Sequence, residues 1–251
     1  YAALAGAGLA VAHALSPDFA AQPVAALLVA AAAALIFAAS AVAARAEPHT
    51  YSCEGLGAAG VILVLAGAFV ALRWASLDGF SELSLRALML MAAGHIALQR
   101  GGESGGFIAR WRGHVLLSLG LAAALLVQTI AAHPWWGISH AAVTGPPLFN
   151  GLALAFAAPA ALSLAASARL YPRERNAARV FAAIGGALAL VWALSEVRRL
   201  FHGAAMATAP LGLAEAACYA LILLAGALAL ALLARRPATA DAPFTQDLDR
   251  K

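Results

Sequence analysis

Residues 24–44 read VAALLVAAAAALIFAASAVAA, a run of 21 residues without a charged side chain. At a rise of about 1.5 Å per residue, such a run forms a helix about 30 Å long, which matches the hydrocarbon core of a bilayer. Lipid offers the backbone no hydrogen-bond partners, so a single segment that crosses it must be helical. This stretch therefore predicts a transmembrane helix.

Similar apolar runs recur along the whole chain. With the first run included, they cover approximately residues 2–15, 24–44, 54–73, 81–99, 114–132, 148–168, 178–200 and 211–234. We therefore expect an all-α fold, a polytopic transmembrane helix bundle of about eight spans over residues 1–236. Residues 237–251 are polar and are expected to form a disordered cytoplasmic tail. Pro159 lies inside the sixth run and predicts a kink there.

The composition excludes a soluble protein. Hydrophobic residues make up 63% of the chain and charged residues 11%, against about a quarter charged residues in soluble domains. The net charge of +4 comes from short basic clusters between the apolar runs. Such clusters are typical of topology signals, and no nucleic-acid-binding motif accompanies them. The lipid bilayer is thus the expected partner, and nucleic acid is not.

The basic residues predict the orientation. Twelve Arg and Lys residues lie in the connections after the second, fourth and sixth runs and in the tail, and three lie in the opposite connections. Positive loops stay in the cytoplasm, so both termini are predicted to be cytoplasmic. All but one of the 16 basic residues are arginine, and alanine is abundant. This composition indicates a bacterial protein, and hence the inner (cytoplasmic) membrane.

Polar side chains gather at the extracytoplasmic ends of the predicted spans. Ionisable residues inside a membrane are candidates for function. Glu82 and Arg86 have the i,i+4 spacing of a helical ion pair, and Glu196 is expected to pair with Arg199 or Arg86. Glu196 and Glu215 flank a short connection and are expected to converge. The candidate polar cluster comprises Glu82, Arg86, Glu196, Arg198, Arg199, His202 and Glu215, and the expected interface anchors are Trp74, Trp135 and Trp136.

The sequence carries no signature of a metal or cofactor site. His133 and His140 are possible zinc ligands, but no third ligand stands at a recognisable spacing. There is no Gly-rich phosphate loop and no Ser nucleophile elbow. The sequence therefore predicts no metal and no cofactor, and it leaves any catalytic residue unknown.

Several short motifs carry a family resemblance. They are HPWW at 133–136, PPLFNGLAL at 146–154 followed by Pro159, and WALSEVRRLFHG at 192–203 followed by Glu215. The chain resembles, over residues 50–235, a family of bacterial predicted membrane proteins known as domain of unknown function 2339. The resemblance implies that this chain is the C-terminal part of a longer multi-spanning protein. The family has no established activity, so the resemblance implies fold and location without chemistry.

These features leave three functions open. The favoured one is a non-enzymatic scaffold or conduit in cell-envelope biogenesis, with envelope proteins as partners. One alternative is a membrane-embedded enzyme that acts on a lipid-linked or glycan substrate at the extracytoplasmic face. It requires the polar cluster to line a cavity. The other is a secondary transporter, which requires broken helices at the midplane of the membrane.

Overall fold

The structure is a computed structural model. It describes residues 6, 7, 9, 10, 24–46, 51–75, 77–100, 107–138, 142–204, 206, 207 and 210–234. The chain divides into two compact units, Tyr1–Thr208 and Ala209–Lys251, and each is described by itself.

The described residues form an all-α protein, as predicted, and contain seven helices. Two of these helices contain a π-helical part. The helices are α3 (Ala25–Ala46), α4 (Tyr51–Trp74), α5 (Gly79–Arg100), α6 (Phe107–Ala122) continued by η1 (Ala123–Ala131), η2 (Ala153–Ala157) continued by α7 (Ala158–Leu170), α8 (Arg175–His202) and α9 (Leu213–Ala234).

Six of these seven helices are long and apolar enough to cross a membrane, and α5 is the exception. This confirms a multi-span membrane protein, but it does not show eight spans. The run at 2–15 lies largely outside the described residues, and so does the tail at 237–251. Helix α5 has the length of a span but carries Glu82, Arg86 and His95, which lower its mean hydropathy. That α5 crosses the membrane stays a prediction.

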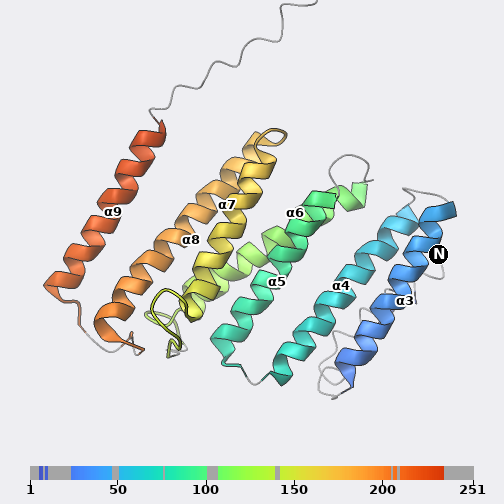
Figure 1. The fold of residues 1–251 in the computed structure, drawn as a ribbon, viewed down its shortest axis with the longest axis horizontal. Helices are drawn as coiled ribbons and strands as arrows, with labels where there is room; N and C mark the ends of the chain where they lie inside the picture. The colour runs from blue at the N-terminus through green and yellow to red at the C-terminus, as the bar shows by residue number, and fades with distance from the viewer. Residues whose placement is uncertain are drawn as a thin grey trace, which may run out of the picture. The chain divides into compact units, whose positions relative to one another are not determined.

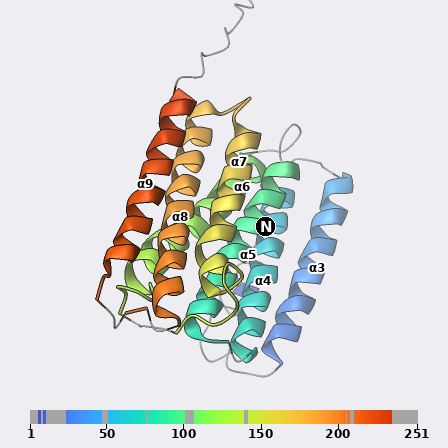
Figure 2. The same ribbon diagram turned by 60° about the vertical axis from the view of Figure 1, so that its left-hand side comes forward.

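In the first unit, helices that follow each other in the chain pack as antiparallel pairs. The closest pairs are α3 with α4, α5 with α6, and α7 with α8. The six helices α3 to α8 run side by side (Figure 1), and the view turned by 60° shows the same arrangement (Figure 2). The main core lies between α5, α6 and α7 and contains Met91, Leu117, Leu152 and Phe156, which are fully buried.

Two glycines let α5 and α6 approach each other closely. A Cβ atom on Gly94 would lie 2.6 Å from the backbone nitrogen of Leu117, and one on Gly120 would lie 2.7 Å from the carbonyl oxygen of Ala87. Both distances are too short for a real side chain. Contacts through small residues are the usual way in which helices associate within lipid, so these glycines set the spacing of the pair.

The distortion expected at Pro159 takes the form of the π-helical turn η2, which ends just before it. Proline has no N–H to donate to the carbonyl of Ala155, four residues earlier. The side-chain amide of Gln128, in the orientation that satisfies both of its ends, donates to that carbonyl at 2.9 Å. Its oxygen accepts from the backbone nitrogen of Ser84 at 3.0 Å. A neighbouring helix thus satisfies the carbonyl that proline leaves without its usual donor.

The second unit contains helix α9. Glu215 lies in its first turn, where a negative charge interacts favourably with the helix dipole. The hydroxyl of Tyr219, one turn later, donates to the Glu215 carboxylate at 2.6 Å. The first turn of α9 is therefore stabilised from within the helix.

Candidate functional site

Most of the buried polar side chains in the described part of the first unit lie where α8 ends. Ser195, Glu196, Arg198 and Arg199, here called the α8 polar turn, occupy its last two turns. They contact the irregular chain between η1 and η2, which is described at residues 132–138 and 142–150 and is here called the connecting segment. The interactions below show how one helix end holds this segment.

Glu196 is the central residue of this site and only 4% exposed. Its carboxylate accepts hydrogen bonds from the side-chain amide of Asn150 at 2.6 Å and from the backbone N–H of Leu148 at 3.3 Å. Within the described residues its partners are therefore these two groups of the connecting segment. The expected pairing with Arg86 or Arg199 is not found. A buried carboxylate needs such donors, because burial without them is costly.

Leu148 has a backbone φ of 67°, a region that residues with a side chain seldom adopt. A bulky residue there is strained, and such strain persists only where the surroundings impose it. Its N–H points at the Glu196 carboxylate. The hydrogen bond to Glu196 therefore compensates part of the strain in the connecting segment.

Asn150 links the same carboxylate to the start of the next helix. Its side-chain oxygen accepts from the backbone N–H groups of Leu152 at 2.7 Å and Ala153 at 3.2 Å. Asparagine is among the preferred residues at a helix N-terminus for this reason. One side chain thus caps the helix that begins at Gly151 and fixes it to Glu196.

Arg199 holds the other part of the connecting segment. Its guanidinium donates to the carbonyl of Pro146 at 3.1 Å and to the carbonyl of Gly145. Gly145 has a φ of 105°, which favours glycine. Arginine offers five donors in a fixed plane, so it can bind two successive carbonyls at once. The turn at 145–148 is held by Arg199 on its carbonyls and by Glu196 on an N–H group.

His133 and Ser195 form a second buried contact between the connecting segment and α8. Both residues are fully buried, and Nε2 of His133 lies 3.0 Å from the Ser195 hydroxyl. That hydroxyl donates its proton to the carbonyl of Val191 at 2.7 Å, while Nδ1 of His133 accepts from the N–H of Trp135 at 3.1 Å. The bonds assign the proton of a neutral imidazole to Nε2. Burial lowers the pKa of His133 to about 4.

A serine next to a histidine suggests a nucleophile and its base, but this geometry does not fit that role. The hydroxyl proton of Ser195 points to the Val191 carbonyl and not to the imidazole. The imidazole ring of His133 is stacked on Trp136, with ring centroids 3.6 Å apart, and packs against Phe156 at 5.3 Å. Neither face of the ring is available to a substrate. We interpret the pair as a structural contact.

Arg198 fixes the chain that follows α8. Its Nε donates to the carbonyl of Met206 at 2.9 Å, and one of its terminal nitrogens lies 2.8 Å from Nε2 of His202. Because a guanidinium can only donate, Nε2 of His202 is the acceptor. The guanidinium also lies over the ring of Trp135, 5.0 Å from its centroid. Arg198 therefore joins the connecting segment, α8 and the chain beyond it.

The three tryptophans expected as interface anchors differ in their surroundings. Trp74 is 53% and Trp136 49% exposed, as an anchor at the headgroup level would be. The indole N–H of Trp136 also donates to the carbonyl of Thr129 at 2.7 Å. Trp135 is half-buried under Arg198. Their role as anchors stays a prediction.

Glu82 and Arg86 form the expected ion pair on α5. Arg86 also lies over the ring of Phe69 on α4, 5.6 Å from its centroid. Helix α5 is capped by Asp78, whose carboxylate accepts from the N–H of Ser81 at 2.9 Å. Burial raises the pKa of Asp78, but hydrogen bonds from Ser81 and from nearby backbone N–H groups outweigh it and leave the pKa below its usual range.

Glu215 belongs to the second unit, so its expected convergence with Glu196 stays a prediction. The structure brings together Glu196, Arg199, Arg198 and His202 at the end of α8, and it places Glu82 and Arg86 in a separate pair on α5.

Sequence reasoning overlooked three members of the site. Asn150 stands directly before an apolar run, which is the usual place of a helix N-cap, and this signal could have identified it. Both His133 and Ser195 lie in the quoted family motifs, but His133 was considered for a chemical role only as a zinc ligand, and Ser195 was assigned none. Their contact joins residues 62 positions apart, and no local spacing reveals it.

The fold and the site together define a class: a multi-span α-helical membrane protein with an irregular segment held against the end of one helix. The chain belongs to the family described as Predicted membrane protein (DUF2339), whose model matches residues 1–242. This confirms the resemblance and extends it beyond residues 50–235. No curated protein and no solved structure matches the chain. Its expected position at the C-terminal end of a longer protein stays a prediction.

Proposed function

We propose that this protein is a non-enzymatic scaffold or conduit of the bacterial inner membrane that works in cell-envelope biogenesis. One observation supports this above all. The carboxylate of Glu196 and the terminal nitrogens of Arg199, in the α8 polar turn, are bound to other parts of the same chain. Glu196 binds Asn150 and Leu148, and Arg199 binds the carbonyls of the connecting segment.

The enzyme alternative has less support. A general acid or base must reach the substrate to within hydrogen-bond distance, directly or through one water. Glu196, Ser195 and His133 are buried, and the hydrogen bonds described above connect them to the protein. A pocket of 340 Å³ in the first unit is lined by none of them. The bonded state of these residues therefore favours a scaffold over a membrane-embedded enzyme for a lipid-linked or glycan substrate.

The transporter alternative draws on the π-helical turns η1 and η2. In transporters, broken helices expose backbone carbonyls that coordinate ions. The carbonyl next to the break at Pro159, that of Ala155, accepts a hydrogen bond from Gln128 instead. A satisfied carbonyl is a poor ion ligand, so the interrupted helix favours rigidity over transport.

The proposal includes an orientation. The ends of α3, α5 and α7 carry Arg45, Arg100 and Arg169, and positive residues remain on the cytoplasmic side. The opposite end, which contains the α8 polar turn, then faces outward, and the N- and C-termini are cytoplasmic. Envelope proteins or a lipid-linked substrate would meet the protein at that outer end.

A complementation experiment separates a scaffold from an enzyme. In a strain that lacks the gene, Ser195→Ala and His133→Gln are each expressed, and envelope permeability is measured together with the amount of folded protein in the membrane. We expect either variant to restore the envelope to the extent that it reaches the wild-type amount, because neither side chain performs chemistry. A folded Ser195→Ala protein at the wild-type amount that restores nothing would contradict the scaffold.

A second variant tests the positive part of the proposal. Arg199→Ala releases the carbonyls of Gly145 and Pro146 and is expected to weaken cross-linking to neighbouring envelope proteins, measured per amount of folded protein in the membrane. Arg73→Gln is the matched control, because Arg73 is an exposed arginine outside the α8 polar turn. Equal cross-linking by both variants and the wild type would count against a scaffold that uses this end.

A further inference from the structure

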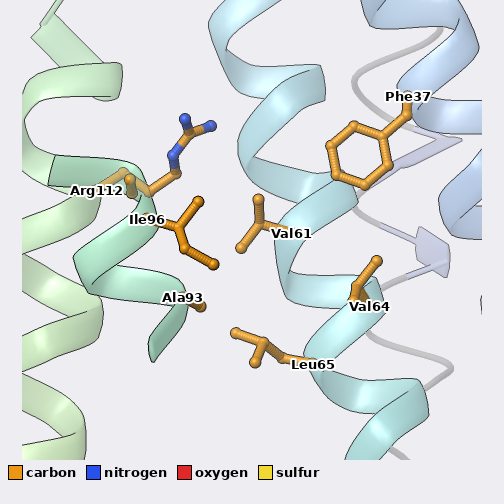
Figure 3. Close-up of a pocket in the computed structure, with 8 residues that line it drawn as sticks. Phe37, Val61, Val64, Leu65, Ala93, Ile96 and Arg112 are labelled. Atoms are coloured by element: carbon orange, nitrogen blue, oxygen red, sulfur yellow. The ribbon is translucent and has the colours of Figure 1, made fainter. Parts of the chain in front are cut away.

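A pocket of 340 Å³ lies among α3, α4, α5 and α6, in a part of the first unit that the site above does not use. Figure 3 shows its lining: apolar side chains from α3, α4 and α5 surround the space, and the guanidinium of Arg112 from α6 lies beside it. The volume is near the lower end of the roughly 300–1,000 Å³ of small-molecule sites. The space suits one slender apolar group.

The pocket is polar near the end of its helices and apolar farther in. Arg112 is the second residue of the candidate span Trp111–Ala131 and so lies close to the membrane surface. Val61 and Leu65 of α4 lie deeper in the span Cys53–Trp74, about 12–18 Å from its start at the helical rise. Both spans begin at the same end of the first unit, since α4 and α6 are separated by the antiparallel α5. The pocket thus becomes less polar with depth, as one lipid leaflet does from its headgroups to its acyl chains.

The apolar side of the pocket is accessible from the bilayer. Phe37, Val64 and Ile96 line it and are 39%, 49% and 49% exposed. On a helix that spans a membrane, exposed apolar side chains contact acyl chains. A chain from the surrounding lipid can therefore enter sideways without a change in the fold.

Arg112 leaves charge available for a ligand. Among the described residues its buried Nε has no hydrogen-bond partner. Gly57 of α4 leaves room for the guanidinium, since a Cβ atom at Gly57 would lie 3.5 Å from it. Glu54, one turn earlier on α4, accepts from the N–H of Ile108 at 2.9 Å, and the ion pairs of the described chain do not include it. Guanidinium and phosphate match in charge and geometry.

We propose that this pocket binds an anionic glycerophospholipid of the surrounding bilayer, with one acyl chain in the apolar space and the phosphate on Arg112. The apolar walls favour a lipid over free phosphate, because free phosphate would bind only the guanidinium of Arg112 and leave the apolar space empty. The site rests on the membrane location of the chain and not on the proposed scaffold function, so either can fail without the other.

The test uses the full chain in nanodiscs of equal parts phosphatidylglycerol and phosphatidylcholine. After gentle extraction, native mass spectrometry measures which lipids remain bound. The wild type is expected to retain phosphatidylglycerol in preference to phosphatidylcholine. Arg112→Gln is expected to lower that preference about fivefold, because a basic residue at an anionic membrane surface contributes about 1 kcal/mol. Arg73→Gln, at an exposed arginine elsewhere, is expected to leave it unchanged.

Two further variants test the geometry. Val64→Phe fills the pocket from its exposed rim, where the larger ring does not crowd the core, and is expected to lower the retention of both lipids. Glu54→Gln removes the carboxylate one turn before Gly57 on α4 and is expected to keep or raise the preference for phosphatidylglycerol. The proposal is overturned if Arg112→Gln keeps the wild-type preference, if Val64→Phe retains as much lipid, or if Glu54→Gln loses the preference as Arg112→Gln does. The last result would mean that Arg112 interacts with Glu54 and not with a lipid phosphate.

Discussion

The two ends of the first unit use arginine in opposite ways. At the end of α8, Arg199 is bound to two carbonyls and Arg198 to a carbonyl and a histidine. At the other end, Arg112 lies beside an apolar space, and within the described residues no nitrogen of its guanidinium takes part in a hydrogen bond or ion pair. The first arrangement fixes the fold, and the second leaves a charge for something outside the protein. The partners of an intramembrane charge are thus more informative than its presence.

Substitution of Glu196 should have the largest effect on stability, because its carboxylate holds the connecting segment against α8. Glu196→Leu removes the acceptor of the Leu148 N–H and leaves the buried amide of Asn150 only its longer hydrogen bond to the Pro146 carbonyl, at 3.4 Å. Each unsatisfied donor costs about 1–3 kcal/mol, so we expect a loss of about 3 kcal/mol in the free energy of unfolding, measured by thermal or denaturant unfolding in detergent. Glu196→Gln keeps one acceptor and should lose less. Equal stability of the Leu variant and the wild type would refute the role assigned to this carboxylate.

The packing of α5 against α6 is the next test. In Gly94→Ala the new Cβ atom meets the backbone of Leu117 at 2.6 Å, and overpacking of this kind costs about 2 kcal/mol. Gly186→Ala on α8 is the matched control, because no atom lies within 4 Å of the added Cβ. It should gain about 0.5–1 kcal/mol from helix propensity. Unfolding of both variants in the same detergent measures the contrast, and a stable Gly94→Ala protein would contradict the close approach.

His133 predicts a dependence of stability on pH. Its pKa of about 4 in the folded protein lies below the ordinary value of about 6.5, so between these values the unfolded chain binds a proton that the folded chain does not. The contribution of His133 to stability should therefore be complete well above pH 6.5 and fall as the pH drops toward 4, by about 1.4 kcal/mol at pH 5.5. The difference between the wild type and His133→Gln, measured from pH 4 to 7, isolates this contribution. A difference that does not vary with pH would exclude it.

Substitution of Arg112, at the opposite end of the first unit, should have the smallest effect on the free energy of unfolding. Because its guanidinium supports no described contact of the fold, Arg112→Gln is expected to change the free energy of unfolding by less than about 0.5 kcal/mol in lipid-free detergent. A loss as large as that of Glu196→Leu would show that Arg112 is structural after all.

Local patterns in the sequence predicted local structure. The i,i+4 spacing of Glu82 and Arg86 predicted their ion pair because both residues lie on one helix. The apolar runs predicted the helices for the same reason. The sixth run, however, was expected to begin at residue 148, whereas the helix begins after the cap at Asn150. Leu148 has a positive φ and cannot continue into that helix.

Contacts through the connecting segment could not be predicted. Glu196 meets residues 46 and 48 positions away, with η2, α7 and most of α8 between them, and no local spacing predicts contacts at that separation. The most obvious partners for a carboxylate were arginines, but the structure uses an amide and a strained N–H. Pro159 predicted a distorted helix, but no local pattern in the sequence indicated that Gln128 would donate a hydrogen bond to the carbonyl of Ala155.

The separation of 46 positions between Asn150 and Glu196 also sets a delay during synthesis of the chain. A ribosome adds about 5–20 residues per second, so the connecting segment waits roughly 2–9 seconds for its carboxylate. During that interval water or the insertion machinery must occupy its donors. We expect nascent chains arrested before residue 196 to be cut by protease in this segment, and chains arrested well beyond α8 to resist. Equal cleavage of both would show that the segment closes without α8.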